Sequence, residues 1–524
     1  MILPDFGGLL LVSQRCFGWI MDRLVTPTDK REHPKQRADM RSITIRPIVF
    51  LIFIITAVCG GATFEVQPGQ RQLFIDDLGV AKIENLERNI HQPAKKGTVL
   101  RPIAPDSTSL QTRTAPVWDP QEKIFKFWVS GSKDPYRTSP DGLHWKSGSD
   151  PESHSHPSMA VRDPKDPDPT RRYKAALLNS GFAVSPDGIH WTKLDLPAIS
   201  SSDEGNFSYN PKDGLFIHTV KRGGKHGRAV ALATSRDFET WTDHGLIFQT
   251  DDEDQDLARE QIRQRFADPT LQHPNLNIPA NYAVDVYNMG VFRYESLYIG
   301  MPAMFIHTGT VGPDWEGFAD FTLAGEPLDY TNTHGDYTGF FHVQLVCSRD
   351  LKTWNRVAKR KPFMETSPLD SGAHDLQTII SPSTAVKRGQ ELWFYYTGGK
   401  GYGVLAAASP TGWNPDWYAV CLAVLRQDGF VSLDAADTAG TVRTRQFKLP
   451  GKMLFVNADA PEGELHVEVL DENDRVIARS DPLKGDMPAT QVKWAKGTLD
   501  QAGQLVTLRF RLSHGRLYSY WFGK

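Results

Sequence analysis

Five segments of the chain place charged or polar side chains where a strand is expected to begin. They are residues 111–117, 154–161, 203–209, 285–291 and 374–379, with Arg113, His156, Glu204, Asp285 and Asp375 as the leading candidates. Carboxyl groups held near one another can divide the work of a general acid and a base or nucleophile, because each raises the pKa of its neighbour. These residue types favour acid–base chemistry, provided that the fold brings the distant segments together.

A repeated motif indicates which elements could do this. The pattern S-x-D-x-x-x-W occurs four times, and a degraded fifth copy lies at residues 426–430; the four full copies begin at Ser139, Ser185, Ser235 and Ser348. Before each copy, apolar and aromatic runs alternate with polar residues and turn signals, which is typical of short antiparallel strands. A four-stranded unit repeated every 40 to 50 residues or so is the pattern of a propeller blade.

The sequence therefore predicts an all-β fold with a five-bladed β-propeller. In each blade the motif aspartate is expected in the turn between the third and fourth strands, and the tryptophan between neighbouring blades. The wide gap between the third and fourth copies contains two insertions, residues 250–281 with a helix-like piece at 257–266, and residues 307–340. Insertions of this size tend to be functional, and we expect them to form walls around one mouth of the propeller.

The two ends of the chain differ from this pattern. After about residue 434, alternating strands without the motif predict a C-terminal β-sandwich. Residues 1–62 contain a basic stretch, an apolar run at 48–58 and small residues at 59–62, which is the layout of a secretory signal. We expect residues 1–62 to be an upstream extension and cleaved signal, with Met40 as an alternative start, residues 63–433 to be the propeller and residues 434–524 the sandwich. The mature chain is then secreted or periplasmic, without a membrane span.

Composition narrows the functional classes. The net charge is −3, from 59 Lys and Arg against 62 Asp and Glu, so no overall basic field favours nucleic acid. The four cysteines have no C-x-x-C spacing, and the sequence leaves open whether Cys347 and Cys421 pair. The chain has no nucleotide-binding loop, H-E-x-x-H or G-x-S-x-G motif, so we expect no cofactor and no metal. The oligomeric state is left open.

Five blades with S-x-D-x-x-x-W turns, a preceding signal and a following small sandwich resemble the glycoside hydrolases of families 32 and 43 over roughly residues 65–524. The chain is also similar to secreted bacterial proteins described as family 32-like. The resemblance implies an axial funnel lined by the innermost strand of every blade. In that funnel a pair or triad of carboxylates would hydrolyse the glycosidic bonds of a polysaccharide or oligosaccharide.

The resemblance also suggests roles for the candidate residues. Glu204 is expected to be the general acid, Asp285 the base or nucleophile, and Asp375 a third carboxylate that orients the sugar or tunes its neighbours. Substrate binding is expected from a larger set of cationic and aromatic side chains: Arg113, His156, Tyr287, His374 and Trp315.

Two other aspartates compete for these roles. Asp77 follows the first strand of the folded region, where the related hydrolases carry a catalytic aspartate, so it is a rival base; its alternative is a turn residue. Asp163 lies in an R-D-P triplet like that of family 32, but the prolines after it favour a hairpin loop. The family 32 motifs W-x-N-D-P-N-G and E-C are absent, which argues against fructan specificity. Two alternative functions remain: a glycan-binding propeller without catalysis, and a glycoside phosphorylase in which Arg113 and His156 hold phosphate.

Overall fold

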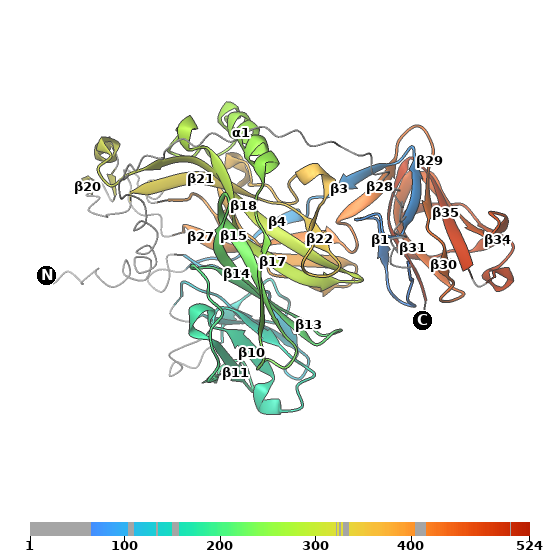
Figure 1. Cartoon of the computed structure of the whole chain (residues 1–524), viewed down its shortest axis with the longest axis horizontal. Helices are drawn as coiled ribbons and strands as arrows, with labels where there is room; N and C mark the ends of the chain where they lie inside the picture. The colour runs from blue at the N-terminus through green and yellow to red at the C-terminus, as the bar shows by residue number, and fades with distance from the viewer. Residues whose placement is uncertain are drawn as a thin grey trace, which may run out of the picture. The chain divides into compact units, whose positions relative to one another are not determined.

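A computed structural model describes residues 64–102, 109–132, 135–148, 157–320, 322–323, 326–327, 335–403, 416–503 and 505–523. Residues 1–63 lie outside the described residues, and with them the predicted signal and the alternative start at Met40. Residues 64–524 form one compact unit built almost entirely of β-strands (Figure 1). In the described part of the chain, no helix is both long and apolar enough to cross a bilayer.

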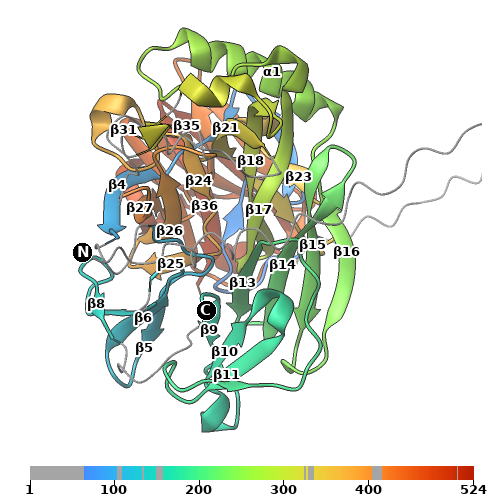
Figure 2. The same ribbon diagram turned by 90° about the vertical axis from the view of Figure 1, so that its left-hand side faces the viewer.

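Five antiparallel sheets form the blades of a β-propeller, as the sequence predicts (Figure 2). Blade 1 contains β5 (Val117–Asp119), β6 (Ile124–Trp128), β7 (Tyr136–Ser139) and β8 (Lys146–Ser147). Blade 2 contains β9 (Ala160–Arg162), β10 (Tyr173–Ala176), β11 (Phe182–Ser185) and β12 (Thr192–Lys193). Blade 3 contains β13 (Gly205–Asn210), β14 (Leu215–Gly224), β15 (Gly227–Ser235) and β16 (Thr242–Phe248).

The last two blades are larger. Blade 4 contains β17 (Ala283–Tyr294), β18 (Leu297–Val311), β22 (Val346–Ser348) and β23 (Asn355–Arg356), with β21 (Asp336–Val343) paired to the far end of β18. Blade 5 contains β24 (Thr378–Ile380), β25 (Ala385–Arg388), β26 (Glu391–Gly399), β27 (Tyr418–Arg426) and β4 (Ala94–Leu100). Because β4 precedes blade 1 in the chain and pairs with β27 of blade 5, this pairing closes the ring.

The repeated motif forms the turn between the third and fourth strands of blades 1 to 4. In blade 2, the Asp187 carboxylate accepts hydrogen bonds from the backbone N–H groups of Ile189 (2.8 Å) and His190 (2.9 Å). The motif tryptophans pack against the preceding blade: Trp241 stacks on Phe182 with ring centroids 4.4 Å apart. Local hydrogen bonds and interblade packing account for the motif, so its aspartates serve the scaffold, as expected.

The C-terminal domain is one continuous antiparallel sheet of twelve strands around its own apolar core, and it corresponds to the predicted sandwich. Its C-terminal members are β28 (Val431–Ala435), β29 (Gly440–Thr444), β30 (Phe447–Lys448), β31 (Leu454–Leu470), β32 (Val476–Ser480), β33 (Leu483–Gln491), β34 (Trp494–Lys496), β35 (Leu505–Ser513) and β36 (Gly515–Phe522). The long strand β31 pairs with β33 and β36, and also with β32 and β35, so it joins the two halves of the sheet.

The N-terminal strands differ from the expectation that residues 63–433 belong to the propeller. The sheet of the C-terminal domain also contains β1 (Gln72–Leu73), β2 (Val80–Glu84) and β3 (Glu87–Ile90), which pair with β36, β29 and β28. Sequence alternation identifies a strand but not its partner, which explains the different assignment. The described part of the chain therefore begins in the sandwich, contributes β4 to blade 5, and returns to the sandwich after blade 5.

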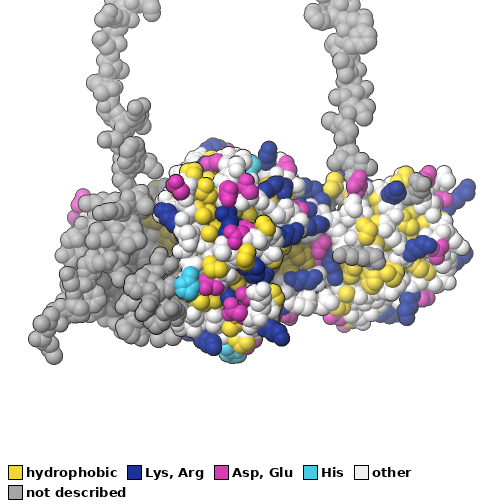
Figure 3. Space-filling view, turned by 90° about the horizontal axis from the view of Figure 1, so that it is seen from below, with side chains coloured by type: hydrophobic (Ala, Val, Ile, Leu, Met, Phe, Trp, Pro, Cys, Tyr) yellow, Lys and Arg dark blue, Asp and Glu magenta, His cyan; other side chains and the backbone are white. Residues whose placement is uncertain are grey.

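The first insertion contains helix α1 (Asp252–Ala267), which is capped by Asp251 and covers the predicted helical piece. Cys347 and Cys421 are both buried and both free thiols, so the pairing that the sequence left open is not formed. On the face drawn in Figure 3, acidic and basic side chains are interspersed, in keeping with the nearly balanced composition.

Candidate functional site

Side chains at the inner strands meet around the propeller axis. Asn288 of blade 4 donates to the Asn206 side chain of blade 3 (2.9 Å), and Asn206 donates to the Ser383 hydroxyl of blade 5 (2.8 Å). Ser383 in turn donates to the backbone carbonyl of Arg113, just before blade 1 (2.5 Å). These buried polar groups link four of the blades. They therefore fix the positions of the inner-strand starts that carry the candidate residues.

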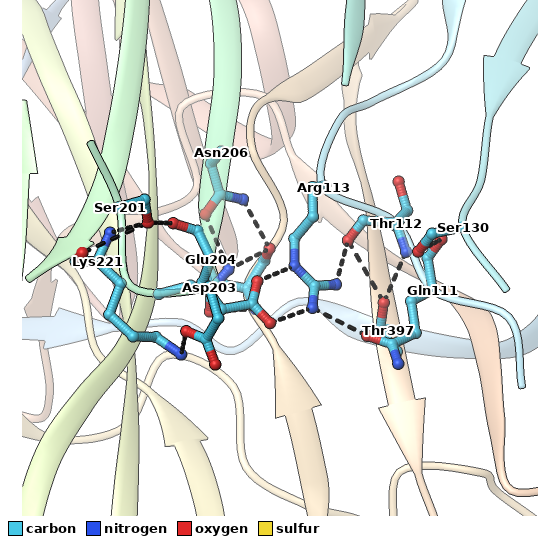
Figure 4. A network of polar contacts seen from close by, with 12 residues as sticks. Gln111, Thr112, Arg113, Ser130, Ser201, Asp203, Glu204, Asn206, Lys221 and Thr397 are labelled. Atoms are coloured by element: carbon cyan, nitrogen blue, oxygen red, sulfur yellow. Dashed lines mark hydrogen bonds and ion pairs between the residues drawn. The ribbon is translucent and has the colours of Figure 1, made fainter. Parts of the chain in front are cut away.

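Arg113 and Glu204 form the central contact of the site. The Arg113 guanidinium donates to both carboxylate oxygens of Glu204, through Nε and through Nη2, the latter at 2.6 Å (Figure 4). Both side chains are about nine-tenths buried. The guanidinium also donates to the Thr112 carbonyl (3.0 Å) and to Gln111 Oε1 (2.9 Å). The structure thus brings together two predicted site residues, one from blade 1 and one from blade 3.

This contact decides the charge of Glu204. Burial by itself raises the pKa of the carboxyl, but the Arg113 guanidinium, the Lys221 ammonium and a hydrogen bond from Tyr287 together bring the pKa below its ordinary value. Glu204 is therefore anionic at neutral pH in the unliganded protein. The mutual pKa-raising expected among clustered carboxylates does not operate on Glu204, because its nearest charged neighbours are cations.

Lys221 is a second buried cation in the cluster. It lies on β14, with its ammonium 2.7 Å from the Asp203 carboxylate and 3.9 Å from the centre of the Tyr287 ring. Burial lowers the pKa of Lys221, although Glu204 and Asp203 act in the opposite direction. Tyr287, predicted to stack on substrate, instead has one ring face covered by this ammonium.

Asp285 has its own set of partners at the start of β17. Its Oδ2 accepts from the Arg228 guanidinium (2.9 Å) and from the Arg228 backbone N–H (3.2 Å), and its Oδ1 lies 3.2 Å from His307 Nε2. Burial raises the pKa of Asp285, but His307 and Arg228 lower it further than burial raises it. Gly227 makes the close approach possible: its φ is +105°, and a Cβ there would lie 2.9 Å from Asp285 Oδ2.

Aromatic hydroxyls extend the cluster beyond Asp285. The Arg228 guanidinium donates to the Tyr337 hydroxyl (3.0 Å), which lies 3.2 Å from the Tyr402 hydroxyl. The Tyr402 and Tyr287 ring centroids are 6.0 Å apart. Through Tyr287 and Tyr402, the surroundings of Glu204 and Asp285 are therefore contiguous. We call this set the axial cluster; it consists of Arg113, Asp203, Glu204, Lys221, Arg228, Asp285, Tyr287, His307, Tyr337 and Tyr402.

Asp375 and His374 have different surroundings. Asp375 is buried, paired with Lys95 of β4 (2.6 Å), and accepts from the Ser367 (2.8 Å) and Tyr396 (3.0 Å) hydroxyls. His374 contacts Asp416 through Nε2 (2.9 Å to the carbonyl). None of these described partners of Asp375 and His374 belongs to the axial cluster.

The remaining candidates are also separate. Asp77 lies between β1 and β2 of the sandwich and pairs with Arg88 (2.5 Å), so this rival base belongs to a different domain. Trp315 packs on Phe318, with ring centroids 5.1 Å apart, in a small core to which both insertions contribute. Asp163 is buried beside Lys174 (3.3 Å), a scaffold contact. His156 lies outside the described residues.

Several members of the axial cluster were not identified from sequence. Lys221, Arg228, His307 and Tyr402 lie away from the inner-strand starts, so counting back from each turn does not find them. Lys221 could have been identified from the sequence, because it is a charged residue that directly follows the mostly apolar segment 215–220 of β14. Within the described ranges, no group of three or more His, Cys, Asp or Glu side chains is arranged to hold a metal ion.

Comparisons of the whole chain with known proteins find remote structural neighbours. No protein-family model and no curated protein matches the chain. One similar solved structure is an N-acetylgalactosamine deacetylase from F. plautii in complex with blood group B trisaccharide, with 12% identity and a TM-score of 0.36 over 65% of this chain and 96% of that chain. Another is a thermostable family-43 glycoside hydrolase, with 11% identity and a TM-score of 0.35 over 63% and 95%. The Bombyx mori family 32 β-fructofuranosidase is 9% identical, with a TM-score of 0.32 over 82% and 94%.

Proposed function

We propose that the axial cluster binds a carbohydrate and hydrolyses its glycosidic bond, with Asp285 and Glu204 as the two carboxylates. The observation that carries this proposal is that two buried carboxylates from neighbouring blades share one contiguous polar and aromatic environment. Hydrolysis of a glycosidic bond uses one carboxyl to protonate the leaving oxygen and one carboxylate as base or nucleophile.

Asp285 suits the anionic role. A carboxylate whose pKa lies below its ordinary value stays ionised over the whole neutral range, as a base or nucleophile must. Arg228 and His307 hold both of its oxygens in place from two different strands, β15 and β18. This fixed orientation would aim the carboxylate at a bound sugar.

Glu204 is the proposed proton donor, and this role requires a change on binding. In the unliganded protein Arg113 holds Glu204 as an anion, so it has no proton to give. When a sugar displaces Arg113 from the carboxylate, burial dominates and raises the pKa of Glu204, which then takes up a proton. We therefore propose that substrate binding converts Glu204 from an ion-pair partner to an acid.

One specific observation favours a second function. Glu204 and Asp285 each already have a cationic partner, which is also the arrangement expected of a glycan-binding propeller without catalysis. For the phosphorylase alternative, the Arg113 that would hold phosphate is occupied by Glu204.

The proposal is tested by incubating the purified chain with a panel of oligosaccharides and polysaccharides and measuring released reducing sugar. Glu204→Gln and Asp285→Asn should each lower hydrolysis at least a hundredfold while sugar binding persists, and Asp77→Asn should leave it unchanged. Hydrolysis unaffected by both substitutions would refute the assignment. Sugar binding without hydrolysis by the wild type would support the second function.

We also propose that the apolar run within residues 40–62 directs export of the chain. N-terminal sequencing of the protein from its native host tests this proposal. A mature N-terminus near residue 62 is expected, and a chain that retains residues 40–62 would contradict it.

A further inference from the structure

The second residue of the S-x-D turn differs between blades in a way that the scaffold does not require. It is Pro140 and Pro186 in blades 1 and 2, but Arg236 and Arg349 in blades 3 and 4. The turn itself is held by the serine and aspartate, as in blade 4, where Asp350 accepts from the backbone N–H groups of Lys352 and Thr353. The side chain between the serine and the aspartate is therefore not needed for the turn itself: Arg349 pairs with Asp76 of the sandwich (2.9 Å), and Arg236 donates to the Asp213 carbonyl (2.6 Å).

Both arginines line one basic groove on the propeller wall. It consists of two adjoining hollows of about 300 and 550 Å³ that share Arg349 and Asp350. The first hollow lies between blades 3 and 4, and the second lies between blade 4 and the sandwich strands. Seven cationic side chains line the two hollows: Arg88, Arg236, Arg293, Arg349, Lys352, Arg356 and Arg445.

The charge of this groove contrasts with that of the chain. Three carboxylates line it, those of Asp76, Asp77 and Asp350, and two more, Asp213 and Asp254, pair with its Arg293 and Arg356. Seven cations minus five anions leaves +2, whereas the chain carries −3. All three lining carboxylates are already used, since Asp76 pairs with Arg349 (2.9 Å), Asp77 pairs with Arg88 (2.5 Å) and Asp350 holds its own turn. A local excess of cations in an acidic protein attracts anionic groups.

Several donors in the groove lack an acceptor. Arg88 Nε is buried without a hydrogen-bond partner among the described residues. The Arg445 side chain donates only through Nε, to the Val80 carbonyl, and the Arg236 side chain only through Nη1, to the Asp213 carbonyl, within the same described ranges. Guanidinium groups with free N–H pairs bind carboxylates in a bidentate manner.

We infer that this groove is a second binding site, for an acidic polysaccharide such as a uronic acid polymer. The inference rests on the proposed function in that both sites take carbohydrate, but it uses none of the axial residues. An acidic polysaccharide is inferred rather than a nucleic acid because the axial cluster is proposed to act on carbohydrate, and a uronate carboxylate can accept two N–H groups of one guanidinium. The groove would hold the polymer while the axial cluster acts on it.

The test is affinity electrophoresis of the full chain in gels containing polygalacturonate or, as the uncharged match, galactan. Polygalacturonate should retard the wild type, with retardation lost as the salt concentration rises, and galactan should retard it at least tenfold less. The triple variant Arg236→Gln, Lys352→Gln, Arg445→Gln should lose at least tenfold in apparent affinity. A control variant with the same charge change, Lys146→Gln, Lys193→Gln, Lys448→Gln, should behave as the wild type.

Other outcomes would overturn the inference. These are equal retardation by galactan, an unchanged affinity of a triple variant that circular dichroism shows to be folded, or stronger retention by single-stranded DNA than by polygalacturonate. Glu204→Gln separates this site from the axial one. If the proposed hydrolysis is wrong but the groove binds, Glu204→Gln and wild type are retarded equally by polygalacturonate while neither releases reducing sugar.

Discussion

The Arg113 guanidinium, which precedes blade 1, and the Glu204 carboxylate, which precedes blade 3, form a buried bidentate ion pair across the propeller axis. The two residues are 91 positions apart, and their blades are not neighbours in the ring. The contact therefore depends on closure of the whole propeller, including the pairing of β4 with β27. It also sets the charge of the carboxylate that the proposed chemistry needs as an acid.

Removing one partner of this pair should be costly. Arg113→Met leaves Glu204 buried without its bidentate partner, and we expect the free energy of unfolding to fall by about 3–5 kcal/mol. Urea denaturation measures the change. Lys82→Met is the control, because Lys82 and Glu84 form an exposed pair that solvent screens, and it should leave the free energy of unfolding nearly unchanged. Equal effects of both substitutions would show that Glu204 is not held by Arg113.

The buried histidines should make stability depend on pH. Burial lowers the pKa of His218 and of His342 from 6.5 to about 4. Because these folded pKa values lie below the unfolded value, the stability that neutral histidine contributes is present above pH 6.5 and is lost as the pH falls toward 4. Denaturation at a series of pH values should show a slope that His218→Gln reduces. An unchanged slope in His218→Gln would contradict this origin of the pH dependence.

Gly227 should tolerate no side chain. Gly227→Ala places a Cβ 2.9 Å from Asp285 Oδ2 at a φ of +105°, so we expect a loss of about 1–3 kcal/mol together with displacement of the Asp285 carboxylate. Gly214→Ala is the matched control: its φ is also positive (+62°), but nothing lies within 4 Å of the added Cβ. Hydrolysis should fall for Gly227→Ala alone. Similar activity of the two variants would mean that the Asp285 geometry is unimportant.

Asp428 is the aspartate of the degraded fifth motif, and its structural role can be tested by substitution. Its buried carboxylate accepts from Tyr294 (2.6 Å) and Ser519 (2.6 Å) and pairs with Arg71, so it joins blades 4 and 5 to the sandwich. Asp428→Ala should cost about 3–5 kcal/mol in the free energy of unfolding, because Arg71 loses its buried partner. Asp141→Ala in an intact motif removes only turn hydrogen bonds and should cost about 1 kcal/mol. A smaller loss at Asp428 than at Asp141 would contradict this role.

Some features of the site could be anticipated and others could not. Glu204 and Asp285 were correctly placed at inner-strand starts, because the turn motif sets the register of every blade. Asp375 was given the same position by the same reasoning, yet its described contacts are with Lys95, Ser367 and Tyr396. A strand start in sequence does not specify which way its side chain turns, since that depends on the neighbouring strands.

The number of blades, the turns and the presence of a second β domain can be predicted from the sequence, since these follow from local hydrogen bonds and from alternation along each strand. The cation that neutralises each carboxylate, and the place of residues 72–90 in the sandwich, depend on contacts that form only in the folded chain. Ion pairs and strand pairs join residues that are distant along the chain, so their formation depends on ring closure and sheet order rather than on local pattern.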